Sequence, residues 1–193
     1  MKTYKKTVES PLLVIGHDQD AESPRKWGNI GYFYTKENNY NSPDGTGEIY
    51  RIMLRAGEEA QNTEDHMQIM GELVNSETGE NVLAIYPVTR YEHGNVVYSI
   101  GSGKGFDSSN CGFYIITDKS HAEMPEKKSE WERIVSNELE IYSQWCNGEV
   151  YQFALYNEKG ELEDSCNGFY DIEDIREYLP ESWKGEDLRK YLK

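Results

Sequence analysis

A long amphipathic helix is predicted between residues 129 and 145, and it limits the folds open to this chain. Its apolar side chains recur at helical spacing, so one face of the helix must be buried against another element. These side chains are Trp131, Ile134, Val135, Leu139, Tyr142 and Trp145. Asn147 and Gly148 follow as a stop signal. The helix therefore needs a sheet or other helices against which to pack.

Strand-like segments lie on both sides of this helix. They are short apolar or alternating runs at residues 8–16, 29–36, 82–90, 96–100, 112–117, 150–156 and 162–170. Strands and helices come in clusters instead of alternating, which favours an α+β fold over a parallel doubly wound one. We therefore expect a single domain over residues 1–193, with a mostly antiparallel sheet and helices packed on one face.

The stretch around residues 47–80 is predicted to be an acidic helical insertion in that domain. Apolar residues follow helical spacing from Ile49 to Ala56, and a second helix is expected to begin at Thr63. Residues 57–80 include seven acidic residues and no Lys or Arg. The whole chain has a formal net charge of −15, so this segment carries nearly half of it.

This charge makes the chain a poor ligand for nucleic acids and anionic membranes, because phosphate contacts require clustered Lys and Arg. It favours a partner protein with a basic surface. The contact residues predicted for that partner lie on the acidic segment and in the loop after the first strand. They are Glu58, Glu59, Glu64, Asp65, Glu72, Asp18 and Arg25. The alternative is a solvated helix face that only aids solubility.

The loop after the first strand contains Asp18 and Asp20. At an extended strand end, carboxylates spaced by two point to the same side, and such oxygen ligands suit Mg²⁺, Mn²⁺ or Ca²⁺. Asp107 or His93 from neighbouring loops would complete a metal site. In the other interpretation, these acids cap the backbone of the loop and Arg25 pairs with one of them. We expect the capping role, with no metal and no other cofactor.

His93 lies at a predicted hairpin tip next to Glu92. A neighbouring carboxylate orients a histidine, as a general base requires. With Asp107, His93 would then be catalytic in a metal-assisted hydrolase of a nucleotide or another phosphate-containing small molecule. The plainer interpretation is an exposed turn residue. We therefore assign no catalytic residue and favour a non-enzymatic binding protein.

Five short strings occur in a fixed order along the chain. They are Asp18 and Asp20–Arg25 with Asn29 and Gly31; Tyr91 and His93; Asp107, Ser108 and Gly112; Gly148–Tyr151 and Phe153; and Asp164–Cys166 with Gly168–Tyr170. In these strings the chain resembles a family of uncharacterised proteins encoded in bacteriophage and prophage genomes. It departs from the family pattern after His93, at Phe106 and at Asn167, and the acidic segment has no counterpart there.

The resemblance implies a phage or prophage setting, and hence the cytoplasm of an infected or lysogenic bacterial host. No stretch approaches the roughly 20 apolar residues of a membrane-spanning helix. In this setting the charge predicts an accessory protein that binds a host or phage protein. Its concrete form is an acidic inhibitor of a host defence or nucleic-acid-binding factor.

Overall fold

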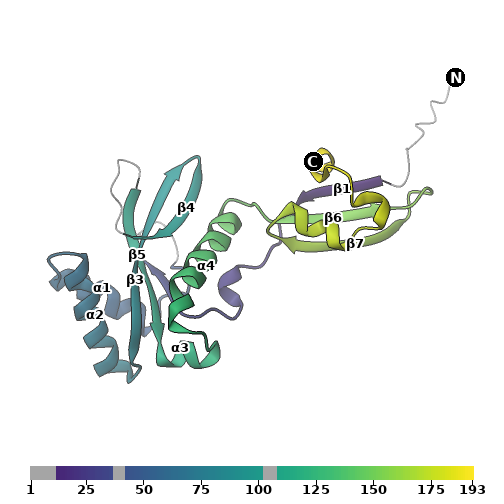
Figure 1. Cartoon of the computed structure of the whole chain (residues 1–193). Coiled ribbons are helices and arrows are strands. Elements are labelled where there is room, and N and C mark those ends of the chain that lie inside the picture. Colours follow the sequence, from purple (N-terminus) through teal and green to yellow (C-terminus); the bar gives the residue numbers. More distant parts are fainter. Residues whose placement is uncertain (1–11, 37–41, 102–107) are drawn as a thin grey trace. The chain divides into compact units, whose positions relative to one another are not determined.

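The computed structural model describes residues 12–36, 42–101 and 108–193. The chain forms two compact units, shown with their elements in Figure 1. The described part of the first unit comprises residues 12–22 and 144–193, and that of the second lies within residues 23–143. The single domain over residues 1–193 stays a prediction, and each unit is described by itself.

The first unit contains a three-stranded antiparallel sheet in the order β1-β6-β7. Its strands are β1 (Leu12–His17), β6 (Tyr151–Tyr156) and β7 (Leu162–Phe169). Three short 3-10 helices follow β7, namely η3 (Ile172–Tyr178), η4 (Glu181–Trp183) and η5 (Leu188–Tyr191). Apolar side chains of all three helices pack with one face of the strands around Ile15, Phe153 and Ile175. In this unit, helices cover one face of a sheet as predicted.

The second unit contains a four-stranded antiparallel sheet in the order β2-β5-β3-β4. Its strands are β2 (Tyr32–Thr35), β3 (Val82–His93), β4 (Asn95–Ile100) and β5 (Ser108–Thr117). Its helices are η1 (Pro24–Lys26), α1 (Glu48–Glu59), α2 (Thr63–Thr78), α3 (Asp118–Glu123), η2 (Lys128–Glu130) and most of α4 (Trp131–Cys146). The antiparallel α+β fold class is therefore confirmed.

Helices cover both faces of this second sheet, and not one face as predicted. Phe113 and Ile115 of β5 pack with α1 and α2. Tyr114 points to the opposite face, where its hydroxyl donates a hydrogen bond to Glu138 of α4. Successive side chains of a strand alternate between faces, so an apolar run such as this one fills two cores. Figure 1 shows α1 and α2 on one side of β3 and β5, and α4 on the other.

Helices α1 and α2 confirm the two helices expected within residues 47–80. The buried residues of α1 recur at helical spacing from Ile49 to Ala56. The Asn62 side chain caps α2 by accepting a hydrogen bond from the backbone N–H of Asp65 at 2.9 Å. Gly79 ends α2 in the left-handed conformation, with φ of 74°. Within the described residues, no helix is long and apolar enough to cross a membrane.

Candidate functional site

Asp18 caps the backbone of its own loop in the first unit. Its Oδ1 accepts a hydrogen bond from the backbone N–H of Asp20 at 3.1 Å, and its own N–H donates to the carbonyl of Val150 at 2.7 Å. The residue is only 7 % exposed. Burial, followed by the charges of Asp18 and Cys146, raises the pKa of Tyr170 to about 12. The local turn of Asp18 is the capping geometry expected of an aspartate at a strand end.

The residues of the metal-dependent alternative are distributed over both units. Asp18 and Asp20 belong to the first unit, whereas His93 belongs to the second, where it is exposed and pairs with Asn95 across the β3–β4 hairpin. Asp107 lies outside the described residues. Within the described ranges, no group of three or more His, Cys, Asp or Glu residues is placed to hold a metal ion. The metal site and its catalytic pair stay predictions.

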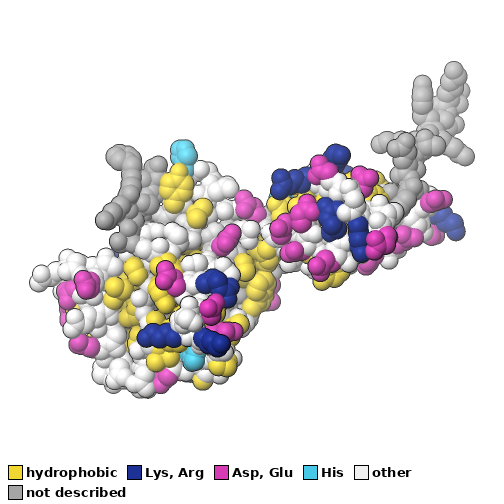
Figure 2. Space-filling view, viewed as in Figure 1, with side chains coloured by type: hydrophobic (Ala, Val, Ile, Leu, Met, Phe, Trp, Pro, Cys, Tyr) yellow, Lys and Arg dark blue, Asp and Glu magenta, His cyan; other side chains and the backbone are white. Residues whose placement is uncertain are grey.

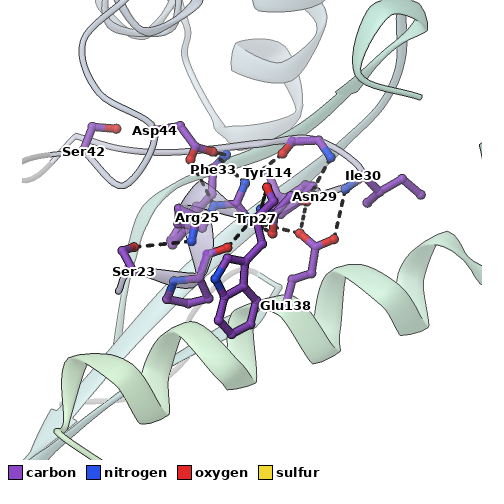
Figure 3. A network of polar contacts seen from close by, with 12 residues as sticks. Ser23, Arg25, Trp27, Asn29, Ile30, Phe33, Ser42, Asp44, Tyr114 and Glu138 are labelled. Atoms are coloured by element: carbon purple, nitrogen blue, oxygen red, sulfur yellow. Dashed lines mark hydrogen bonds and ion pairs between the residues drawn. The ribbon is translucent and has the colours of Figure 1, made fainter. Parts of the chain in front are cut away.

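Arg25 is the centre of a buried polar network in the second unit (Figure 3). Its side chain is 3 % exposed, and all five of its N–H groups donate hydrogen bonds. Two of them form a fork on the Asp44 carboxylate, at 3.0 and 2.6 Å. The other three go to Asn29 Oδ1 and Glu138 Oε2, both at 2.9 Å, and to the Gly31 carbonyl at 2.7 Å. We call Arg25, Asn29, Asp44, Tyr114 and Glu138 the Arg25 network.

The two carboxylates of the Arg25 network also accept hydrogen bonds from the backbone. Asp44 Oδ2 accepts from the N–H of Phe33 at 2.5 Å, and Glu138 Oε1 accepts from that of Ile30 at 3.0 Å. The hydroxyl of Tyr114 donates to Glu138 and accepts from the Gly31 N–H at 3.0 Å. The network thus joins the η1 loop, the turn before α1, β5 and α4.

The protonation states within the Arg25 network are fixed by its geometry. Burial disfavours the charged guanidinium, but the hydrogen bonds to Asp44 and the negative charges of Asp44 and Glu138 outweigh it and raise the pKa of Arg25. Burial also raises the pKa of Tyr114 well above its usual range, with Arg25 opposing and Glu138 adding to the shift. Arg25 therefore stays charged and Tyr114 neutral at physiological pH. All five donors of Arg25 are used inside the protein, so we leave it out of the proposed contact surface.

Asp44, Tyr114 and Glu138 were not among the residues singled out by the sequence. Glu138 offered a signal, because it lies four residues after Ile134 and four before Tyr142 on the apolar stripe of α4. A carboxylate in a buried stripe requires a cationic or hydrogen-bonding partner. Arg25 pairs with the acids Asp44 and Glu138, and not with Asp18 or Asp20 as the capping interpretation expected. Its partners lie 19 and 113 residues away and not in its own loop.

Four of the predicted contact residues are exposed on α1 and α2. Glu58 and Glu59 end α1, and Glu64 and Glu72 lie on α2. Asp65 is half-buried, and its Oδ2 accepts a hydrogen bond from the backbone N–H of Gln61 at 2.9 Å, so it stabilises the start of α2. We call Glu58, Glu59, Glu64 and Glu72 the acidic face. Figure 2 shows acidic side chains over this part of the second unit.

His66 packs between α1 and the sheet. Its Nε2 lies 2.7 Å from the carbonyl oxygen of Met53, and its ring contacts Phe113 edge-on with 4.6 Å between centroids. Burial lowers the pKa of His66; the hydrogen bond to Met53 opposes this shift, and the charge of Lys36 adds to it. The folded state therefore holds His66 neutral over a range of pH in which the unfolded chain becomes protonated.

We expect the free energy of unfolding to fall as the pH decreases from about 7 to about 5. The unfolded chain, with an ordinary histidine pKa of about 6.5, takes up a proton that the folded state resists, so stability decreases with falling pH. Urea unfolding at several pH values measures the slope. The variant His66→Gln should reduce the slope of unfolding free energy against pH between about 5 and 7. His93→Gln, at an exposed position, should leave this slope unchanged. Equal slopes for the native chain and His66→Gln would contradict the assignment.

Comparison with known proteins gives no relative for this arrangement: no protein-family model, curated protein or solved structure matches the chain at a significant level. The resemblance to phage and prophage proteins therefore stays a prediction. A function has to be argued from the geometry of the described residues.

Proposed function

We propose that this protein is an accessory protein of a phage or prophage that binds a basic surface of a host or phage protein. The contact is made by the acidic face of α1 and α2, and the bound partner is a defence or nucleic-acid-binding factor that is thereby inhibited. The observation that carries the proposal is the exposure of four carboxylates on a helix pair whose other side is anchored in the core.

The positions of the four carboxylates follow from the two helices. Only residues 60–62 separate α1 from α2, so the end of the first helix and the start of the second are near in sequence and share the same turn. Glu64 and Glu72 are eight residues apart on α2, which places them on one side of the helix and about 12 Å apart along its axis. Gln68, also exposed, lies between them and donates a hydrogen bond to Glu72 at 3.1 Å.

The buried sides of α1 and α2 hold these charges in place. Ile52, Met53, Met70 and Val74 are almost fully buried and pack with Phe113 of the sheet. A charged surface on an ordered support loses little conformational freedom on binding. Complementary charge then raises the association rate and selects partners of opposite sign. A basic groove that normally holds nucleic acid is a surface of this kind.

Neutralising the acidic face should abolish most binding to a basic probe. We expect the variant Glu58→Gln/Glu59→Gln/Glu64→Gln/Glu72→Gln to bind an oligolysine peptide about tenfold more weakly than the native chain at 50 mM salt. Raising the salt to about 300 mM should weaken the native chain by a similar factor, because exposed charges are screened. Fluorescence anisotropy of the labelled peptide measures both effects.

A control variant removes the same number of charges from exposed positions of the first unit. It is Glu158→Gln/Glu163→Gln/Asp174→Asn/Glu177→Gln. If the control loses as much affinity as the acidic-face variant, net charge alone explains the binding and the proposal is wrong. Capture from a bacterial host lysate with the same three proteins then identifies partners, which must be retained by the native chain and the control but lost by the acidic-face variant.

A further inference from the structure

A cavity of about 440 Å³ opens beside the Arg25 network in the second unit. This volume lies within the range of small-molecule and side-chain sites in proteins. Its walls include the rings of Trp27 and Tyr32 and the thioether of Met124, together with the charged side chains of Lys26 and Glu123. The cavity therefore combines aromatic surface with both signs of charge.

Trp27 is exposed on a loop whose backbone is held in place. The Asn29 amide donates hydrogen bonds to the carbonyls of Trp27 at 2.8 Å and Pro24 at 3.1 Å, and its Oδ1 accepts from Arg25. Nevertheless the Trp27 side chain is 48 % exposed, and Figure 3 shows its ring pointing away from the guanidinium of Arg25. An exposed tryptophan on an ordered loop is a typical anchor for a ligand, because little ordering remains to be done on binding.

The cavity wall holds the acids Asp44 and Glu123 and the cations Arg25 and Lys26, and Arg25 is already paired with Asp44 and Glu138. Burial, followed by the carboxylates of Glu80, Glu123 and Asp44, raises the pKa of Tyr32, so these three acids lie near its hydroxyl. Within the neighbouring network, Asp44 and Glu138 carry two negative charges against the single positive charge of Arg25. Aromatic faces next to a carboxylate attract a planar guanidinium through its charge and its flat surface.

We propose that this cavity binds the guanidinium group of an arginine side chain, stacked on Trp27 and paired with Glu123. The inference rests on the proposed function and deepens it, because the arginine belongs to the basic partner. It gives the partner a specific anchor in addition to the general attraction of the acidic face.

The full-length protein can be tested with N-acetyl-arginine methylamide and its neutral isostere, the citrulline derivative. We expect the arginine compound to shift the indole N–H resonance of Trp27 in NMR spectra and to bind at least about fivefold more tightly than the citrulline compound. An arginine-containing peptide should also shift the Trp27 indole N–H resonance, because the cavity recognises only the guanidinium group. The absence of binding by the arginine compound, or equal binding of both compounds, would overturn the proposal.

Three variants locate the site. Trp27→Ala should weaken binding of the arginine compound about fivefold or more, whereas Tyr178→Ala, at an aromatic residue of the first unit that is 55 % exposed, should leave it unchanged. Lys26 is a cation of the cavity wall, as is the buried Arg25, so Lys26→Met should strengthen binding of the arginine compound. Weaker binding by Lys26→Met, or no effect of Trp27→Ala, would exclude a guanidinium at this position.

The acidic-face variant separates this inference from the proposed function. It should lose the oligolysine peptide and keep the arginine compound, whereas Trp27→Ala should lose the arginine compound. If the acidic-face variant keeps the oligolysine peptide, the acidic face is not the basic-partner surface, and binding of the arginine compound still decides the cavity. The arginine compound could show no binding while the acidic-face variant loses the oligolysine peptide as expected. In that case only the proposed guanidinium site is wrong.

Discussion

Replacement of Arg25 by methionine is expected to lower the free energy of unfolding by about 3–5 kcal/mol, the range for breaking a buried ion pair from one side. The substitution removes five hydrogen-bond donors and leaves Asp44 and Glu138 as carboxylates at 12 and 13 % side-chain exposure without their cation. The loss of stability arises because two partly buried carboxylates are left without a cation, and not because the native ion pair is strong. Denaturant unfolding followed by circular dichroism measures the loss.

An exposed ion pair gives the matched control for Arg25. Arg133 pairs with Glu130 at 3.0 Å, with side chains that are 63 and 43 % exposed. Arg133→Met should therefore cost no more than about 1 kcal/mol. Arg25→Lys tests the shape of the group, because an ammonium keeps the charge but cannot form the fork on Asp44, so it should restore only part of the lost stability. Equal losses of unfolding free energy for Arg25→Met and Arg133→Met would show that the Arg25 network stabilises the fold no more than an exposed ion pair does.

The helices were predictable because their evidence is local. The apolar residues of α1, α2 and α4 recur every three or four positions. The N-cap residue of α2, Asn62, directly precedes the helix in the sequence. The covering of the second sheet on both faces was missed, although β5 carried a signal for it. Its residues from Phe113 to Ile116 are all aromatic or aliphatic and all buried, and a continuous run of this kind is typical of a strand between two layers.

The Arg25 network was not predictable, because its partners are distant in sequence. Asp44 lies in a segment from which the sequence singled out no residue, and Glu138 lies in a helix whose pattern predicted only packing. Pairing over 113 residues depends on how β2, β5 and α4 meet, which no local pattern encodes. Three residues of the first of the five strings, Arg25, Asn29 and Gly31, meet in one hydrogen-bonded cluster.

Gly112→Ala is expected to destabilise the protein about as much as Arg25→Met, with a loss of about 3 kcal/mol or more in the free energy of unfolding. A Cβ atom at this position would lie 1.9 Å from the carbonyl oxygen of Tyr34 and 2.8 Å from the Cα of Thr35. Both atoms belong to the backbone of β2, which pairs with β5 at this residue, so relief requires the strands to separate. Gly16→Ala in β1 is the control, because nothing lies within 4 Å of its Cβ position, and a change within about 0.5 kcal/mol is expected. Denaturant unfolding compares the two, and similar stabilities would refute the close approach of β2 to Gly112.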